Sequence, residues 1–132
     1  MAAMQPTTSA RLAAVFGGLA VAMGAFGAHA MQDRYDAHTL DIFEKAVRYQ
    51  MYHALALGLC AALGFCGRPT RAAAISFTIG IALFSGSLYA LVFTGTKTFG
   101  AVTPFGGVAF LVGWTLLAWP RPTTGTAPPA AP

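Results

Sequence analysis

Long apolar runs alternate with short polar segments along the chain. Four runs contain no Asp, Glu, Lys or Arg, and they cover residues 12–32, 49–67, 72–96 and 98–120. About 20 apolar residues, at a rise of 1.5 Å each, cross a hydrocarbon core of roughly 30 Å. The pattern therefore predicts membrane-spanning helices.

We predict an all-α, polytopic membrane protein, folded as a four-transmembrane-helix bundle with an amphipathic extension at the start of the second helix. Thr103 and Pro104 are typical of a helix N-cap followed by Pro at the first helical position, so the fourth helix starts inside its run. The expected segments are a tail at 1–11, a membrane domain at 12–120 with spans near 12–32, 49–67, 72–96 and 104–120, and a disordered Pro/Ala-rich tail at 121–132.

The first run has an alternative interpretation as a cleaved secretory signal. Residues 28–30 read Ala-His-Ala, which has the form of a signal-peptidase site. Against cleavage, the small residues Ala20, Gly24 and Ala28 recur every four positions, as they do where membrane helices pack closely. We expect the helix to be retained.

Charge and cysteine content narrow the function classes. Charged residues make up 9% of the chain, against roughly 25% in soluble proteins. The net charge is +4, but the eight basic residues are scattered, so no nucleic-acid partner is expected. Cys60 and Cys66 lie on one helix about 9 Å apart along its axis, too far to form a disulfide with each other.

The segment between the first two runs holds all the acidic residues of the chain: Asp33, Asp36, Asp41 and Glu44. A helix is expected to start near residue 40, capped by Thr39 or Asp41, and to continue to about residue 66. Asp41 with Lys45, and Glu44 with Arg48, are favourable i,i+4 pairs on this helix. These pairs suit a solvated helix extension above the membrane.

A second interpretation makes this region a functional polar cluster. A hairpin between the first two helices could bring together His29, Glu44, Arg48, Tyr49 and His53. His and Tyr are also common headgroup anchors, which is the alternative. The spacings of 9 and 15 between His29, His38 and His53 match no metal motif, so neither a metal nor another cofactor is expected. Haem ligation by His29 and His53 is the disfavoured alternative.

Small residues also recur at helix-packing spacing in the other spans. The predicted contact positions are Ala54, Gly58, Ala82, Gly86, Gly106 and Gly113. Lys and Arg give four bases on each side of the predicted bundle, so their count leaves the membrane orientation open. The acids beside the first-loop bases favour both termini in the cytoplasm.

Four motifs resemble a known family. GAFGAHA at 24–30, FEKAVRYQMYHALAL at 43–57, FSGSLY at 84–89 and TPFGGVAFLVGW at 103–114 are similar to the small YgdD-type inner-membrane proteins, which have short eukaryotic transmembrane relatives. The resemblance covers about residues 12–119. It implies a four-helix membrane protein with a retained first helix, and it implies no reaction or site residues.

The function expected is that of a non-enzymatic structural or accessory module in the bacterial inner membrane. Its partners would be the lipid bilayer, further copies of the chain or another membrane protein. The alternative is a small transporter or channel component with a polar path through His53, Ser85 and Ser87. No acidic residue lies within the four runs, and coupled transport usually needs one at depth, so the path is disfavoured.

Overall fold

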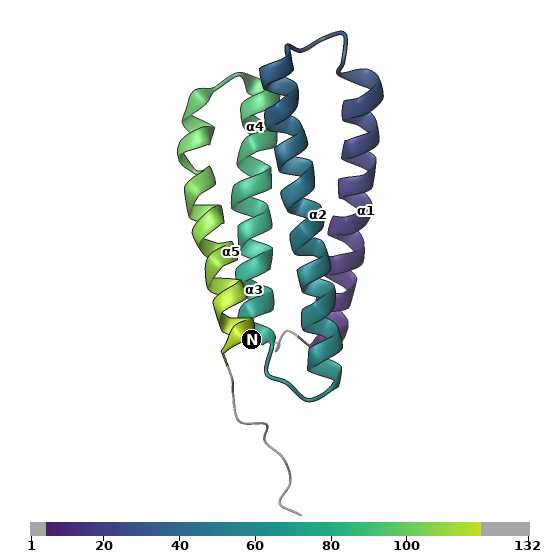
Figure 1. Ribbon diagram of the computed structural model, residues 1–132, viewed down its shortest axis with the longest axis vertical. Coiled ribbons are helices and arrows are strands. Elements are labelled where there is room, and N and C mark those ends of the chain that lie inside the picture. Colours follow the sequence, from purple (N-terminus) through teal and green to yellow (C-terminus); the bar gives the residue numbers. More distant parts are fainter. Residues whose placement is uncertain (1–4, 120–132) are drawn as a thin grey trace, which may run out of the picture.

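The computed structural model describes residues 5–119, and within them the chain is entirely helical apart from short connections. The elements are α1 (Pro6–Ala30), α2 (Ala37–Phe65), α3 (Arg71–Gly80), the π-helical η1 (Ile81–Ser85), α4 (Gly86–Thr94), the 3₁₀-helical η2 (Lys97–Ala101) and α5 (Thr103–Ala118). Because α3, η1 and α4 form one continuous rod, the described chain is a bundle of four rods (Figure 1).

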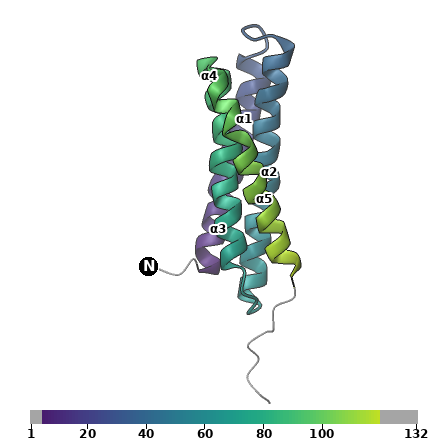
Figure 2. The same cartoon turned by 90° about the vertical axis from the view of Figure 1, so that its left-hand side faces the viewer.

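The rods lie side by side and run alternately up and down (Figures 1 and 2). The connections 31–36 and 95–102 are at one end of the bundle, called here the loop end. The connection 66–70 is at the opposite end, together with the start of α1 and the end of α5. Rods that follow one another in the sequence are therefore antiparallel, as their short connections require.

Three helical segments of residues 5–119 are long and apolar enough to cross a membrane: Pro6–Ala30, Arg71–Thr94 and Lys97–Ala118. Many of their exposed side chains are large and apolar: Leu111 and Phe105 are each 68% exposed, and Val21 is 63% exposed. The second predicted span falls within α2, which does not meet the same criterion because charged and polar residues occupy its first half.

Three predicted helix starts need correction. Helix α2 begins at Ala37 rather than near residue 40, because the Asp36 side chain caps it by accepting the backbone N–H of Thr39 at 3.0 Å. Helix α1 begins at Pro6, so residues 6–11 belong to the helix and not to a tail. Helix α5 begins at Thr103, one residue before the predicted position. The predicted tail at 121–132 lies outside the described residues.

Helices α1 and α2 pack through small residues. A Cβ added to Gly24 would lie 3.4 Å from Val47, and one added to Gly27 would overlap the Phe43 ring at 2.7 Å. Ala20 and Ala54 are buried, and Gly58 approaches Ala13. Ala28, predicted on the same stripe, is exposed instead. The α1–α2 contact thus runs the length of the hairpin, down to Gly64 beside Pro6.

The α3–α5 contact depends on aromatic rings that fill the space above glycines. Phe110 lies over Gly80 and Phe77 lies over Gly113, so that an added Cβ would overlap a ring at 2.3 and 2.6 Å. Gly106 meets backbone: its added Cβ would be 2.3 Å from the backbone nitrogen of Phe84. Gly106 and Gly113 therefore lie in the contact, as the sequence pattern predicted.

The stripe predicted from Ala82 and Gly86 is wrong. Both residues are exposed, and a Cβ added to Gly86 would have nothing within 4 Å. The buried row on this rod is Phe77, Ile81, Ser85, Leu88 and Val92. Ala82 and Gly86 each follow a buried residue by one position, which places them about 100° around the helix, on the outer surface.

Candidate functional site

The buried imidazole of His53 is held from two sides in the middle of α2. The indole Nε1–H of Trp114 in α5 donates to His53 Nε2 at 3.2 Å, and His53 Nδ1 lies 2.8 Å from the backbone oxygen of Tyr49. The ring stacks on Phe110, with centroids 3.4 Å apart and planes at 5°. Trp can only donate, so Nε2 carries no proton and Nδ1–H donates to Tyr49. The network therefore requires a neutral imidazole in one tautomer.

This arrangement leaves neither ring nitrogen of His53 free. Binding a metal or haem through His53 would require breaking the bond to Trp114 or the bond to the Tyr49 carbonyl. Within residues 5–119, no group of three or more His, Cys, Asp or Glu side chains is close enough to hold a metal ion.

Gln50 joins three helices and was not singled out by the sequence analysis. Its Nε2 donates to the backbone oxygen of Phe16 in α1 at 2.9 Å, and its Oε1 accepts from the Tyr89 hydroxyl in α4 at 3.0 Å. The side chain is buried. A signal was available in the sequence, since Gln50 lies three positions after Val47 and four before Ala54, two apolar residues of the same predicted helix.

Two serines of the third rod form separate contacts. The Ser85 hydroxyl donates to the backbone oxygen of Ala46 at 2.8 Å. Ser87 lies 2.7 Å from the Thr103 hydroxyl and donates to the Phe84 carbonyl at 3.0 Å. Neither serine hydrogen-bonds to His53, so the described residues provide no continuous polar line through all three. Among residues 5–119, every buried side-chain nitrogen and oxygen atom has a hydrogen-bond partner.

A lateral groove of about 510 Å³ lies between α1 and α2, towards the loop end. Its apolar lining includes Gly24, Gly27, Ala28, Phe43, Val47 and Met51. It remains open because α1 contributes only residues with small or absent side chains along this edge. This volume is within the range of roughly 300–1,000 Å³ that small-molecule sites occupy.

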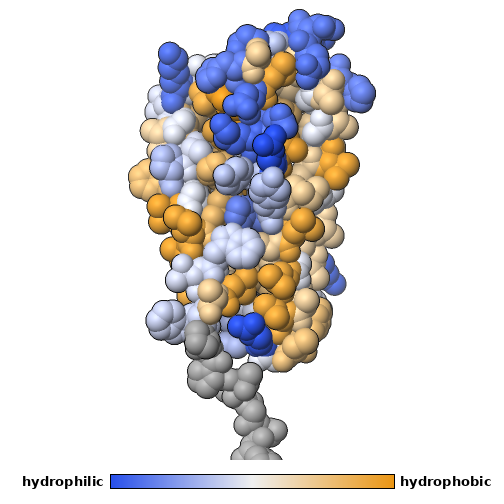
Figure 3. All heavy atoms as spheres, in the orientation of Figure 1, coloured by the Kyte–Doolittle hydropathy of each residue, from blue (hydrophilic) through white to orange (hydrophobic). Residues whose placement is uncertain are grey.

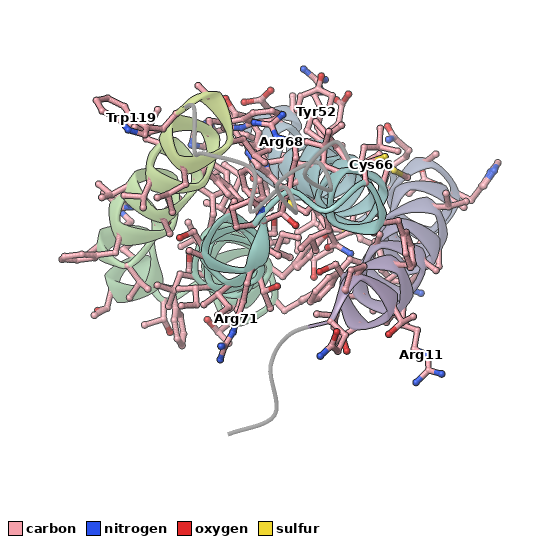
Figure 4. The ribbon with its side chains drawn as sticks, turned by 90° about the horizontal axis from the view of Figure 1, so that it is seen from below. Arg11, Tyr52, Cys66, Arg68, Arg71 and Trp119 are labelled. Atoms are coloured by element: carbon pink, nitrogen blue, oxygen red, sulfur yellow. The ribbon has the colours of Figure 1, made fainter. Side chains whose placement is uncertain are left out.

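Charged side chains line the same groove. Glu44 and Arg48 form an i,i+4 ion pair there, and their side chains are 65% and 53% exposed. The Glu44 carboxylate raises the pKa of the Arg48 guanidinium through a hydrogen bond and through its charge. Tyr52 also lines the groove and points outward from α2 (Figure 4). Hydrophilic residues gather towards the loop end of this face, and apolar ones predominate below (Figure 3).

The structure divides the predicted polar cluster into separate parts. Glu44 and Arg48 face the groove beside α1, whereas Tyr49 and His53 stack against Phe110 of α5. His29 belongs to neither group. It follows Gly27, which contacts α2, by two positions or about 200°, and it is exposed.

Depth also separates the two histidines. Gly27, near His29, lies beside Phe43, and Gly17 lies beside Ala54. His53 is thus about ten helical residues, or roughly 15 Å, from the level of Phe43. His29 and His53 cannot bind one ion or one haem iron together in this arrangement.

Comparison with known proteins identifies the family. Residues 23–107 match the family described as "Protein of unknown function (DUF423)". No solved structure matches the chain. The chain is 46% identical over 100 residues to a UPF0382 membrane protein of Staphylococcus aureus, with 75% of this chain and 82% of the relative covered.

Two further relatives come from other bacteria. The UPF0382 membrane protein YwdK of Bacillus subtilis is 44% identical over 103 residues, covering 75% of this chain and 83% of its own length. The Haemophilus influenzae relative, also named a UPF0382 membrane protein, is 41% identical over 110 residues, covering 82% and 88%. The chain therefore belongs to the DUF423 family, whose matched members are named UPF0382 membrane proteins, and it is a multi-pass membrane protein.

Proposed function

We propose that this protein is a non-enzymatic, four-span module of the bacterial inner membrane that acts through contacts with lipids or with other membrane proteins at its outer surface. We also propose that the chain is related to the YgdD-type inner-membrane proteins and to their short eukaryotic transmembrane relatives. Nucleic acid is not among the proposed partners.

The fourth span in this proposal is α2. It packs against α1 from Phe43 beside Gly27 to Gly64 beside Pro6, so the two helices occupy the same depth. Helix α1 ends at one end of the bundle and α3 begins at the other, which supports α2 as a span between them (Figure 1). The polar side chains of Gln50 and His53 lower the hydropathy of α2. They are compatible with a span because both are hydrogen-bonded to other helices.

The observation that carries the proposal is the closed interior. Gln50, His53 and Ser85 each bind a group on a neighbouring helix, and these bonds hold the helices together. An acyl- or phosphoryl-transfer enzyme needs a nucleophile beside a base. Among residues 5–119, the one Ser, Thr or Cys side chain that hydrogen-bonds to an acidic or His side chain is Thr39, and its bond to Asp36 belongs to the cap of α2. The groove beside Glu44 and Arg48 faces outward, where lipids and neighbouring proteins lie.

Native mass spectrometry of the full chain in mild detergent tests the proposal. The expected spectrum contains the bare chain or its homo-oligomer, with bound phospholipid or a co-purified membrane protein. A stoichiometric metal, haem or organic cofactor mass would contradict a non-enzymatic module. A matched His53→Phe variant that lost such a mass would then assign the cofactor to this histidine.

A further inference from the structure

The groove between α1 and α2 lies at a defined depth. Trp119, Arg68 and Arg71 are at the end opposite the loop end, where Trp and Arg are typical of a membrane–water boundary. Counting about 20 residues, or roughly 30 Å, from Phe65 along α2 reaches Lys45. Glu44 and Arg48 are therefore at the headgroup level of the other leaflet, and Met51 and Tyr52 are below them.

The charges at this level are of both signs. Glu44 uses Oε1 for Arg48, and no hydrogen bond to its Oε2 is found among residues 5–119. Arg48 uses one Nη of the five N–H donors that a guanidinium carries. A free carboxylate oxygen thus lies beside free guanidinium donors, over an apolar groove.

From this geometry we infer that the groove binds a phospholipid whose headgroup carries a primary ammonium beside its phosphate, as phosphatidylethanolamine does. Arg48 binds the phosphate and Glu44 accepts from the ammonium. An acyl chain lies against Gly24, Val47 and Met51. The inference rests on the proposed membrane module and names the lipid class for its outer surface.

The choice among lipids follows from Glu44. Both phosphatidylethanolamine and phosphatidylglycerol offer one phosphate charge to Arg48, but phosphatidylglycerol has no ammonium to compensate the Glu44 carboxylate. Phosphatidylcholine has a quaternary ammonium without N–H, so it cannot donate to Glu44. Below the groove, Leu55 and Leu59 continue the Met51 row as exposed apolar side chains on which the rest of the chain can lie.

The test is a titration of the delipidated full-length protein in detergent, followed by native mass spectrometry. The probes are phosphatidylethanolamine, phosphatidylcholine and phosphatidylglycerol with identical acyl chains. We expect phosphatidylethanolamine to bind about tenfold more tightly than the other two, since a hydrogen bond to a charged group is worth about this factor. Equal affinities would overturn the inference.

Variants locate the site. Glu44→Gln should abolish the preference for phosphatidylethanolamine over phosphatidylglycerol, and Arg48→Gln should weaken both about tenfold. The matched controls are Asp41→Asn and Lys45→Gln, an i,i+4 pair on the same helix whose side chains lie off the groove. Controls that weakened binding as much as Glu44→Gln and Arg48→Gln would overturn the site.

A second pair of variants tests the apolar part without changing charge. Ala28→Leu fills the groove, whereas Ala25→Leu adds the same side chain to an exposed position of α1 that does not line it. Only Ala28→Leu should weaken binding. Occupation of the groove by a second copy would instead give a dimer that Ala28→Leu dissociates, and this result would also overturn the lipid inference.

These outcomes are distinct from failure of the proposed function. Equal binding of the three lipids by a cofactor-free bundle would remove the lipid inference and leave the membrane module in place. A cofactor mass in the spectrum of the untreated protein would remove the proposed function itself, whatever the lipid titration gives.

Discussion

Individual polar side chains at membrane depth are the residues whose roles the structure makes specific. The sequence predicts His53 in a polar cluster with His29 and Glu44, but its partner Trp114 is 61 positions away. Periodicity within α2 carries no information about such a partner, because a hydrogen bond between helices depends on how they are rotated. The same reason explains why the bridge formed by Gln50 was missed while the local pair Glu44–Arg48 was predicted.

The His53–Trp114 hydrogen bond should contribute measurably to stability. Trp114→Phe keeps an aromatic ring but removes the Nε1–H donor, and His53→Phe removes the acceptor. A double-mutant cycle should give a coupling of about 0.5–1.5 kcal/mol in the free energy of unfolding, the range found for bonds between membrane helices. Unfolding in mixed micelles with increasing SDS measures it. Strictly additive single-mutant effects would contradict the bond.

Gln50 should be more sensitive to substitution than its partner Tyr89. Gln50→Leu leaves the Tyr89 hydroxyl without an acceptor and the Phe16 carbonyl without its side-chain donor. We expect a loss of about 1–3 kcal/mol in the free energy of unfolding, against about 0.5–1.5 kcal/mol for Tyr89→Phe. The Gln50→Leu/Tyr89→Phe double variant should cost less than the sum. A larger loss for Tyr89→Phe than for Gln50→Leu would disagree with this geometry.

At the scale of elements, the positions of the helices were largely predictable and their contact faces were not. Uncharged runs predicted the α2–α3 hairpin, and the cap signal at Thr103–Pro104 predicted the start of α5 to within one residue. Small residues at helix-packing spacing were ambiguous, since they occur both at Gly106, against backbone, and at Gly86, on the open surface. A glycine is required only where another atom occupies the space of a side chain, and that atom belongs to a distant segment.

The two glycines form a matched pair for testing this distinction. Gly106→Ala would force its Cβ to within 2.3 Å of the Phe84 backbone nitrogen, and backbone cannot rotate away. We expect a loss of about 1–3 kcal/mol in stability from overpacking. Gly86→Ala meets nothing within 4 Å and should stabilise the helix by about 0.5–1 kcal/mol. Thermal unfolding in detergent compares them, and similar effects of the two substitutions would contradict the packing described.

The start of α2 should depend on pH through Asp36. Hydrogen bonds from the backbone N–H and the hydroxyl of Thr39 lower the pKa of the Asp36 carboxyl. A lowered pKa in the folded state means that the stabilisation is fully present above the ordinary value and is lost as pH falls through the folded value, below about pH 4. Asn also caps helices but carries no charge.

Comparing the chain with its Asp36→Asn variant isolates this contribution. The difference in melting temperature should be constant from pH 7 to about pH 5 and should shrink or reverse at lower pH. Other carboxylates affect both proteins alike and cancel in the difference. A difference independent of pH down to about pH 2 would show that Asp36 is not charged in its capping role.

The whole molecule is asymmetric in its charges, and this asymmetry bears on its orientation. Arg11, Arg68 and Arg71 lie towards the end opposite the loop end, where the described residues include no acid. All the acids of the chain are at the loop end, where Asp41 and Glu44 pair with Lys45 and Arg48. Equal numbers of Lys and Arg on the two sides of the bundle leave its membrane orientation open when the sequence is considered alone. We predict that these three arginines, which form no ion pair among residues 5–119, lie on the cytoplasmic side.

Cysteine labelling tests both the orientation and the crossing of α2. Cys66 is exposed at the arginine-rich end, and Cys60 is buried and serves as an internal control. A membrane-impermeant maleimide should label Cys66 only after cells are permeabilised. Asp33→Cys, at the loop end of a chain with Cys60→Ala and Cys66→Ala, should be labelled in intact cells. The reverse pattern would invert the orientation but keep four spans. Equal accessibility of both positions in intact cells would contradict α2 as a span, because Asp33 and Cys66 are connected only through α2.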